Sequence, residues 1–86
     1  MNNKVLIKLF FPKLEKTFDM YIPVNQIIWK INILLVKAIS SLCNIDLKSD
    51  NYVLINKTTG KIYGNNEILI ETDIRNATEL LLIEQI

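Results

Sequence analysis

The chain has no histidine, and its 86 residues include only one cysteine, two glycines and two prolines. Without histidine, Ser-His-Asp and Cys-His catalytic sites are excluded. The single cysteine, Cys43, excludes an internal disulfide and a four-cysteine iron–sulfur cluster, and one thiol with scattered carboxylates makes a zinc site implausible. We therefore expect no catalytic residue, no metal and no cofactor, and we expect Cys43 to be a small apolar side chain near a helix end.

The chain also lacks a strong charge of either sign and an uninterrupted membrane-length apolar run. Its formal net charge is +1, so the electrostatic basis for binding nucleic acid is weak. The most apolar region, residues 27–43, contains Lys30 and Lys37. Each lysine would cost about 2.5–3.5 kcal/mol at the centre of a bilayer. No signal-peptide pattern precedes it, and we expect a cytoplasmic protein without membrane insertion.

Half of the residues are hydrophobic, and their spacing predicts strands around one helix. Residues 4–11 and 17–22 alternate in the period of two that is typical of strands, and Pro23 ends the second run. Further strands are predicted at residues 52–56, 61–63 and 80–83, with a turn at Gly60. Because the first and last runs are strongly apolar, we expect them to pair at the centre of the sheet.

The helix is predicted from Val24 to about Leu42, with Asn25 as its N-terminal cap and Asn44 as its end. The expected core face consists of Val24, Ile28, Ile31, Leu35, Ala38 and Leu42. Trp29, Ile33 and Val36 form a stripe nearly opposite that face. Two explanations fit this stripe. Either the segment 42–50 covers it through Ile45 or Leu47, or it contacts another chain, such as the second copy in a homodimer.

One helix and four or five strands predict an α+β fold, with the helix packed on one face of a mixed sheet and residues 1–86 forming a single domain. The element order is that of the β-grasp fold. Residues 16–22, Lys-Thr-Phe-Asp-Met-Tyr-Ile, resemble the second strand of ubiquitin. The helix residues Ile28, Ile31 and Leu35 follow Ile22 at the intervals found in ubiquitin, and Leu69, Ile74 and Leu80 share its later spacing.

The segments 53–57 and 61–64, followed by Leu69 and the pair Asp73-Ile74, more narrowly resemble the YukD/EsaB family. These are small ubiquitin-like proteins that occur with type VII secretion systems of Gram-positive bacteria. The resemblance implies a non-catalytic accessory or adaptor protein that binds components of the secretion machine in the cytoplasm.

Two alternatives remain at the level of the sequence. A covalent modifier or a sulfur carrier of the β-grasp class needs a C-terminal Gly-Gly tail, because only glycine lets the backbone thread into the activating enzyme. The chain ends in Leu82-Ile83-Glu84-Gln85-Ile86, so we expect no conjugation unless a longer precursor exists. The second alternative is a domain cut from a larger membrane protein.

A partner-binding surface is predicted on the sheet face that lies away from the helix. If Val5, Ile7, Val53, Ile55, Leu80 and Leu82 point at the helix, strand alternation places five other side chains on the outer face. These are Leu6, Lys8, Leu54, Leu81 and Ile83. They resemble the positions of the main recognition surface of ubiquitin, which combines an apolar patch with nearby basic residues.

Overall fold

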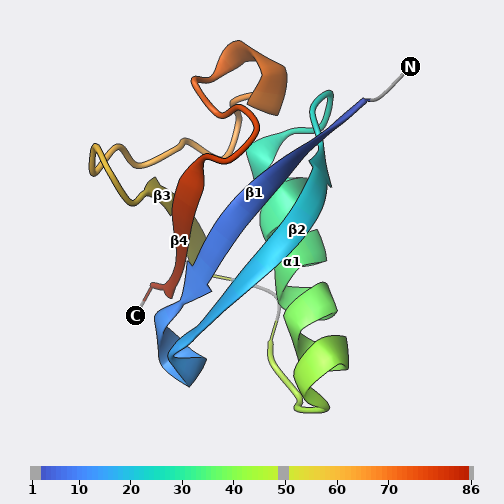
Figure 1. Ribbon diagram of the computed structural model, residues 1–86. Coiled ribbons are helices and arrows are strands. Elements are labelled where there is room, and N and C mark those ends of the chain that lie inside the picture. The colour runs from blue at the N-terminus through green and yellow to red at the C-terminus, as the bar shows by residue number, and fades with distance from the viewer. Residues whose placement is uncertain (1–2, 49–50, 86) are drawn as a thin grey trace.

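The computed structural model describes residues 3–48 and 51–85, and within them it contains four strands, one α-helix and two short 3-10 helices. In chain order, these elements are β1 (Lys4–Phe11), η1 (Pro12–Leu14), β2 (Lys16–Pro23), α1 (Ile28–Cys43), β3 (Tyr52–Asn56), η2 (Leu69–Glu71) and β4 (Glu79–Glu84). Figure 1 shows them in the order of the chain. None of the helices in this part of the chain is long and apolar enough to cross a membrane.

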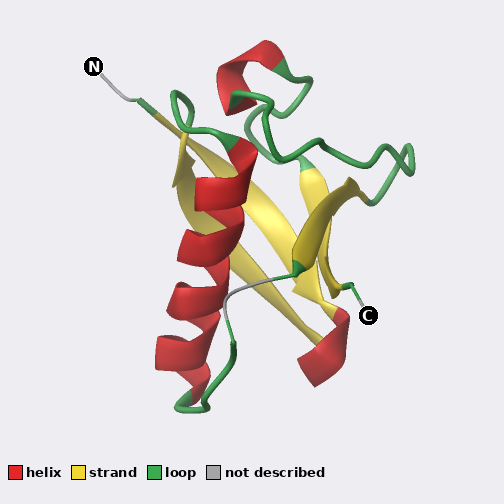
Figure 2. Cartoon of the chain, turned by 180° about the vertical axis from the view of Figure 1, so that it is seen from behind, coloured by secondary structure: helices red, strands yellow, loops and turns green. Residues whose placement is uncertain are grey.

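The four strands form one mixed sheet in the order β2-β1-β4-β3. β1 and β2 form the predicted antiparallel hairpin, and β3 pairs with β4 in antiparallel fashion. β1 and β4 are parallel neighbours, with Leu9 opposite Leu80, so the first and last strands do meet at the centre. α1 covers one face of this sheet, as Figure 2 shows from behind. The predicted β-grasp architecture is therefore confirmed.

The ends of α1 are stabilised differently from one another. The first residue of the helix is Ile28, and Asn25 does not cap it, so that prediction was wrong. Instead, the loop before η2 supplies backbone carbonyls: Ile28 N–H donates to Glu67 O at 2.9 Å, and Trp29 N–H donates to Asn65 O at 3.2 Å. The helix ends at Asn44 as predicted, in the left-handed conformation (φ 54°) that asparagine tolerates better than most residues.

The buried face of α1 is rotated relative to the predicted face. Val36 was predicted on the outward stripe but is fully buried, whereas Leu42 was predicted in the core and is 68% exposed. Asn32, which looks like a surface residue in the sequence, lies one helical turn before Val36 on this buried face. Its Nδ2 donates to the Tyr52 backbone carbonyl at 3.1 Å, whereas its buried Oδ1 has no hydrogen-bond partner among the described residues. The face turns inward because it buries the apolar Val36, and the one hydrogen bond of Asn32 lowers the cost of burying its amide.

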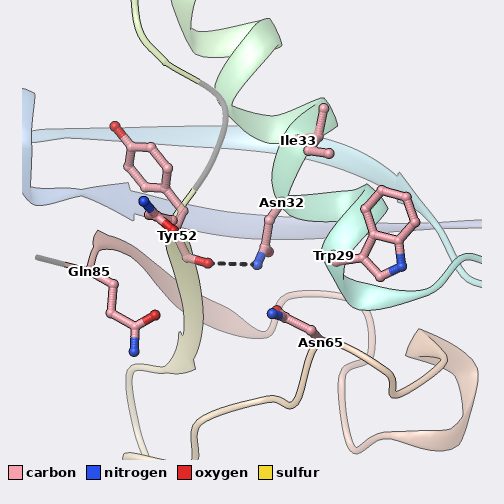
Figure 3. A pocket seen from close by; sticks show the side chains of 7 residues that line it. Trp29, Asn32, Ile33, Tyr52, Asn65 and Gln85 are labelled. Carbon is pink, nitrogen blue, oxygen red and sulfur yellow. Dashed lines mark hydrogen bonds between the residues drawn. The ribbon is translucent and has the colours of Figure 1, made fainter.

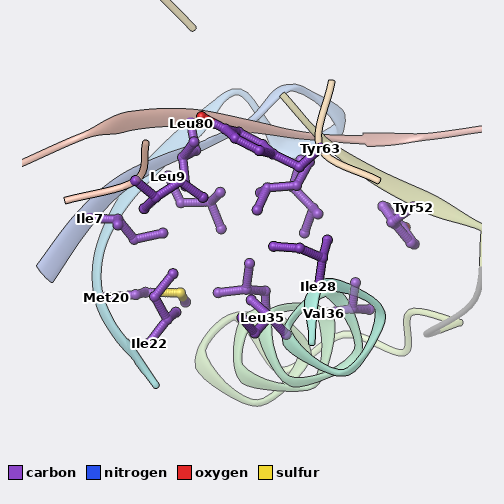
Figure 4. Packing of buried hydrophobic residues seen from close by; sticks show 14 of the residues in the cluster. Ile7, Leu9, Met20, Ile22, Ile28, Leu35, Val36, Tyr52, Tyr63 and Leu80 are labelled. Atoms are coloured by element: carbon purple, nitrogen blue, oxygen red, sulfur yellow. The ribbon is translucent and has the colours of Figure 1, made fainter. Parts of the chain in front are cut away.

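The core lies between α1 and the inner face of the sheet (Figure 4). β1 and β4 contribute the side chains predicted for them, including Ile7, Leu80 and Leu82, and the loop residues Leu69 and Ile74 are buried as expected. The remaining buried hydrophobic side chains of the sheet and of the segment after β3 are Leu9, Phe11, Met20, Ile22, Tyr52, Leu54 and Tyr63.

β3 has the opposite phase to the one predicted. Leu54 is fully buried, while Val53 and Ile55 are only partly buried and lie on the other side of the strand. The predicted strand at residues 61–63 is reduced to one bridge between Ile62 and Ile55. Gly60 has the positive φ (78°) that the predicted turn requires.

Candidate functional site

The candidate site is an apolar surface on the outer face of the sheet, which we call the outer-sheet patch. It consists of Phe10 on β1, Val53 and Ile55 on β3, and Leu81 and Ile83 on β4, all partly buried. Alternation places them outside because their strand neighbours, such as Leu9, Leu54 and Leu80, are buried against α1. The patch therefore lies on the side of the sheet opposite the helix (Figure 1).

The strand register makes this patch contiguous. Leu81 lies opposite Phe10 on one side and opposite Ile55 on the other, so these three side chains form a row across β1, β4 and β3. Ile83 and Val53 form a second cross-strand pair beside that row. Ile62, which bridges to Ile55, extends the patch and is 63% exposed. Neighbouring outward aliphatic side chains on paired strands give a surface suited to contact with another protein.

Charged side chains border the outer-sheet patch. The ammonium group of Lys57 lies 5.4 Å from the centre of the Phe10 ring and 3.9 Å from Glu79 Oε1. On the β2 side, Lys8 Nζ lies 3.6 Å from Asp19 Oδ1. These pairs are exposed and therefore contribute little to stability. At the rim of a binding surface, they can still orient a charged partner.

Four of the five residues predicted for this face do lie on it: Leu6, Lys8, Leu81 and Ile83. Their role in binding stays a prediction. Leu54 was placed there wrongly, because it packs in the core. The sequence analysis missed Phe10, Val53 and Ile55. The alternation in residues 4–11 was a signal for Phe10, since it shares a strand face with Leu6 and Lys8.

Trp29 and Ile33 of the predicted helix stripe form a second surface. Trp29 is 43% exposed and Ile33 is partly buried, and both line a pocket of about 260 Å³ between α1 and the start of β3. Figure 3 shows Asn32 pointing from the same helix toward Tyr52, with Asn65 and Gln85 across the pocket from α1. Since Val36 is buried, this surface is smaller than the predicted stripe.

A polar network lies beside the core, where Tyr63 Oη accepts from Asn56 Nδ2 at 3.1 Å and donates to Asp73 Oδ1 at 2.6 Å. Burial, with the Asp73 hydrogen bond as the next cause, raises the pKa of Tyr63 to about 12. At neutral pH, this phenol therefore stays protonated and acts as a structural hydrogen-bonding group. Within residues 3–48 and 51–85, acidic and cysteine side chains form no cluster of three that could hold a metal ion.

Neither a protein-family model nor a curated protein matches the chain in sequence. Solved structures, in contrast, match it over nearly its whole length. An N-terminal ubiquitin-like domain solved in solution has a TM-score of 0.71 and 19% identity, over 99% of this chain and 78% of that one. A chain of an ESX-5 inner membrane complex has a TM-score of 0.78 and 13% identity, over 98% of this chain and 21% of that one.

A chain in a complex of toluene 4-monooxygenase with 4-bromobenzoate is also similar, with a TM-score of 0.72 and 6% identity over 95% of this chain and 99% of that one. At such low identities, the similarity concerns the fold. The fold is ubiquitin-like. Because these three examples among the matching structures come from such different proteins, function must be argued from the surfaces of this chain.

Proposed function

We propose that the chain is a non-catalytic, ubiquitin-like adaptor that binds another protein through the outer-sheet patch. The observation that carries this proposal is the contiguous row of Phe10, Leu81 and Ile55 across three strands, bordered by Lys57. Apolar area of this kind, rimmed by charged groups, is typical of protein interaction sites. The buried polar groups of the network around Tyr63 have structural partners, which fits a protein that acts by binding.

The partner we propose is a component of a bacterial type VII secretion machine, met in the cytoplasm. Two observations support this assignment. The segments 53–57 and 61–64 resemble the YukD/EsaB family. A chain of an ESX-5 inner membrane complex, which is a secretion complex, has this fold over 21% of its length.

The test compares two sets of substitutions of the same chemical type. The double variant Ile55→Thr, Ile83→Thr removes apolar area from the outer-sheet patch and keeps β-branched residues in the strands. Ile70→Thr is the control, since Ile70 is 56% exposed and lies in η2, away from the patch. Each protein is cross-linked in cells that express it naturally, captured, and its partners are identified by mass spectrometry.

We expect the wild type and Ile70→Thr to recover secretion-machine components and the double variant to lose them. Circular dichroism establishes that all three proteins are folded. Recovery of partners unrelated to secretion would contradict the type VII assignment and leave the binding role in place. A higher intact mass from conjugation, or a C-terminal thiocarboxylate, would overturn the adaptor role in favour of a modifier or sulfur carrier.

A further inference from the structure

A second apolar site lies between β2 and the C-terminal half of α1, which we call the β2 groove. It is an open groove of about 610 Å³, separate from the outer-sheet patch. Its lining includes Met20 and Ile22 from β2 and Leu34, Leu35, Ala38 and Leu42 from α1. Leu34 is 50% exposed and Leu42 is 68% exposed, so large aliphatic surface is open to solvent here. Apolar side chains of a partner would remove this area from water.

The groove runs beside a sheet edge that is open in the described part of the chain. β2 is the outermost strand next to β1 (Figure 1). Val24 N–H donates to Asn3 O, and backbone hydrogen bonding between antiparallel strands alternates from residue to residue. The backbone N–H and C=O groups of the even-numbered residues of β2 therefore point toward β1. The N–H and C=O groups of Thr17, Asp19 and Tyr21 therefore point outward. Such a row of backbone groups is a template for an added strand.

The opposite edge of the sheet does not offer this template. Along β3, Tyr63 N–H donates to Leu54 O, and Asn56 N–H donates to Lys61 O. Asn32 Nδ2 donates to the Tyr52 carbonyl at the start of the same strand. The chain thus covers the β3 edge with its own groups, whereas the β2 edge borders the apolar groove.

The charged residue that lines the β2 groove is a lysine, and the charged residues of the neighbouring helix are lysines too. Lys30 and Lys37 are the charged residues of α1, and both lie within one helical turn of Leu34. Lys4 lines the groove beside Pro23. The nearest acidic residue on β2, Asp19, has its side chain on the outer sheet face, where it pairs with Lys8. A segment carrying carboxylates is therefore favoured over a basic one.

We propose that the β2 groove binds an extended, acidic segment of another protein, which adds to the sheet as a strand along β2. Large aliphatic side chains at alternate positions of that segment fill the groove, because successive residues of a strand point to opposite faces. Aspartate or glutamate residues flanking them lie near Lys37 and Lys4. This site does not depend on the outer-sheet patch, so the protein offers two binding faces and can bring two partners together.

The probe is a synthetic peptide with isoleucine at alternate positions, threonine between them and glutamates at its ends. Amide NMR spectra are recorded as the peptide is added to the protein. We expect signals to shift at Thr17, Asp19 and Tyr21 and along α1 from Leu34 to Leu42, and hydrogen exchange of the outward β2 amides to slow. The same peptide with N-methylated backbone amides lacks strand donors and is expected not to bind.

Reversing the charge of a lysine beside the groove tests whether the site prefers an acidic peptide to a basic one. Lys37→Glu is expected to weaken binding of the acidic peptide about twofold to fivefold and to strengthen binding of a peptide with lysine in place of glutamate. Lys57→Glu makes the same change on the far side of the sheet and is expected to leave both affinities unchanged. Leu34→Ser, at a half-exposed position, is expected to weaken both peptides.

Several results would overturn the proposal. These are absence of binding, signal changes confined to the outer-sheet patch, and equal binding of the N-methylated peptide. Concentration-dependent dimerisation that protects the same β2 amides without peptide would assign the groove to a second copy of this chain instead. The variant Ile55→Thr, Ile83→Thr separates the two proposals, since it is expected to bind the peptide as the wild type does.

Discussion

The hydroxyl group of Tyr63 lies 2.6 Å from Oδ1 of Asp73 and donates a hydrogen bond to it, while the same oxygen accepts from Asn56. This relationship joins the segment after β3 to the loop that precedes β4. Tyr63 and Asn56 are buried, so the hydrogen bond between them is shielded from water, whereas the one to the exposed Asp73 is only partly shielded. Replacement by phenylalanine keeps the ring and leaves Asn56 Nδ2 and Asp73 Oδ1 without this partner. We expect Tyr63→Phe to lower the free energy of unfolding by about 1–3 kcal/mol in urea denaturation.

Stability is expected to fall in alkaline solution because of the same residue. The folded-state pKa of Tyr63 is about 12, against an ordinary value of 10.0, so the folded protein holds the proton more tightly than the unfolded chain. The stabilisation is complete below pH 10 and is lost as the pH rises toward 12, with a slope of up to about 1.4 kcal/mol per pH unit.

Thermal unfolding across this pH range checks the prediction. In Tyr63→Phe, this part of the alkaline decline should be absent. Tyr21→Phe is the matched control, since Tyr21 is 64% exposed, and it should retain the wild-type decline. An unchanged decline in Tyr63→Phe would show that another group is responsible.

The phase of β3 can be tested with neighbouring substitutions. Leu54 is fully buried, and Leu54→Ala should lower the free energy of unfolding by about 2–5 kcal/mol through lost contacts and a cavity. Val53→Thr changes a partly exposed side chain, and we expect a loss below about 1 kcal/mol. Chemical denaturation of both variants gives the comparison. If Val53→Thr lowered the free energy of unfolding more than Leu54→Ala does, Val53 rather than Leu54 would face the core.

Replacing one alanine in the turn before β4 should stabilise the protein. Ala77 has a φ of 71°, a conformation that glycine adopts without the clash of a Cβ atom. Ala77→Gly is expected to raise the free energy of unfolding by about 0.5–1 kcal/mol, because relief of this strain exceeds the entropic cost of glycine. The same change in the helix, Ala38→Gly, should instead destabilise by about 1 kcal/mol. If both variants are destabilised in urea titrations, the turn is not strained.

The β-grasp layout could be predicted from the sequence because several independent patterns indicate the same arrangement of strands. β1 and β4 are apolar enough that only the centre of the sheet suits them, and Pro23 fixes where β2 ends. The inward residues of β1 and β4 followed from plain alternation, and Leu6, Lys8, Leu81 and Ile83 were therefore placed on the correct face.

The errors arose where a polar side chain is buried with its own partners. Asn56 suggests an outward position, yet its Oδ1 accepts from the backbone N–H groups of Thr58 and Thr59, and its Nδ2 reaches Tyr63. With Asn56 inside, Leu54 is inside as well, which reverses the phase expected for β3. Asn32 likewise lies on the buried face of the helix. Periodicity treats every asparagine as exposed, and only the three-dimensional contacts show that both are buried, Asn56 with hydrogen bonds at both ends of its amide and Asn32 with one through Nδ2 alone.

The parallel pairing of β1 with β4 has a consequence for synthesis of the protein on the ribosome. Lys8 leaves the ribosome early, but its strand neighbour Glu79 is made after every other element of the sheet. Until β4 emerges, β1 has an unpaired inner edge and β3 has no strand beside it. The sheet therefore cannot be completed until residues 79–84 are available, and until then the apolar strands of the nascent chain are open to chaperones or to premature pairing.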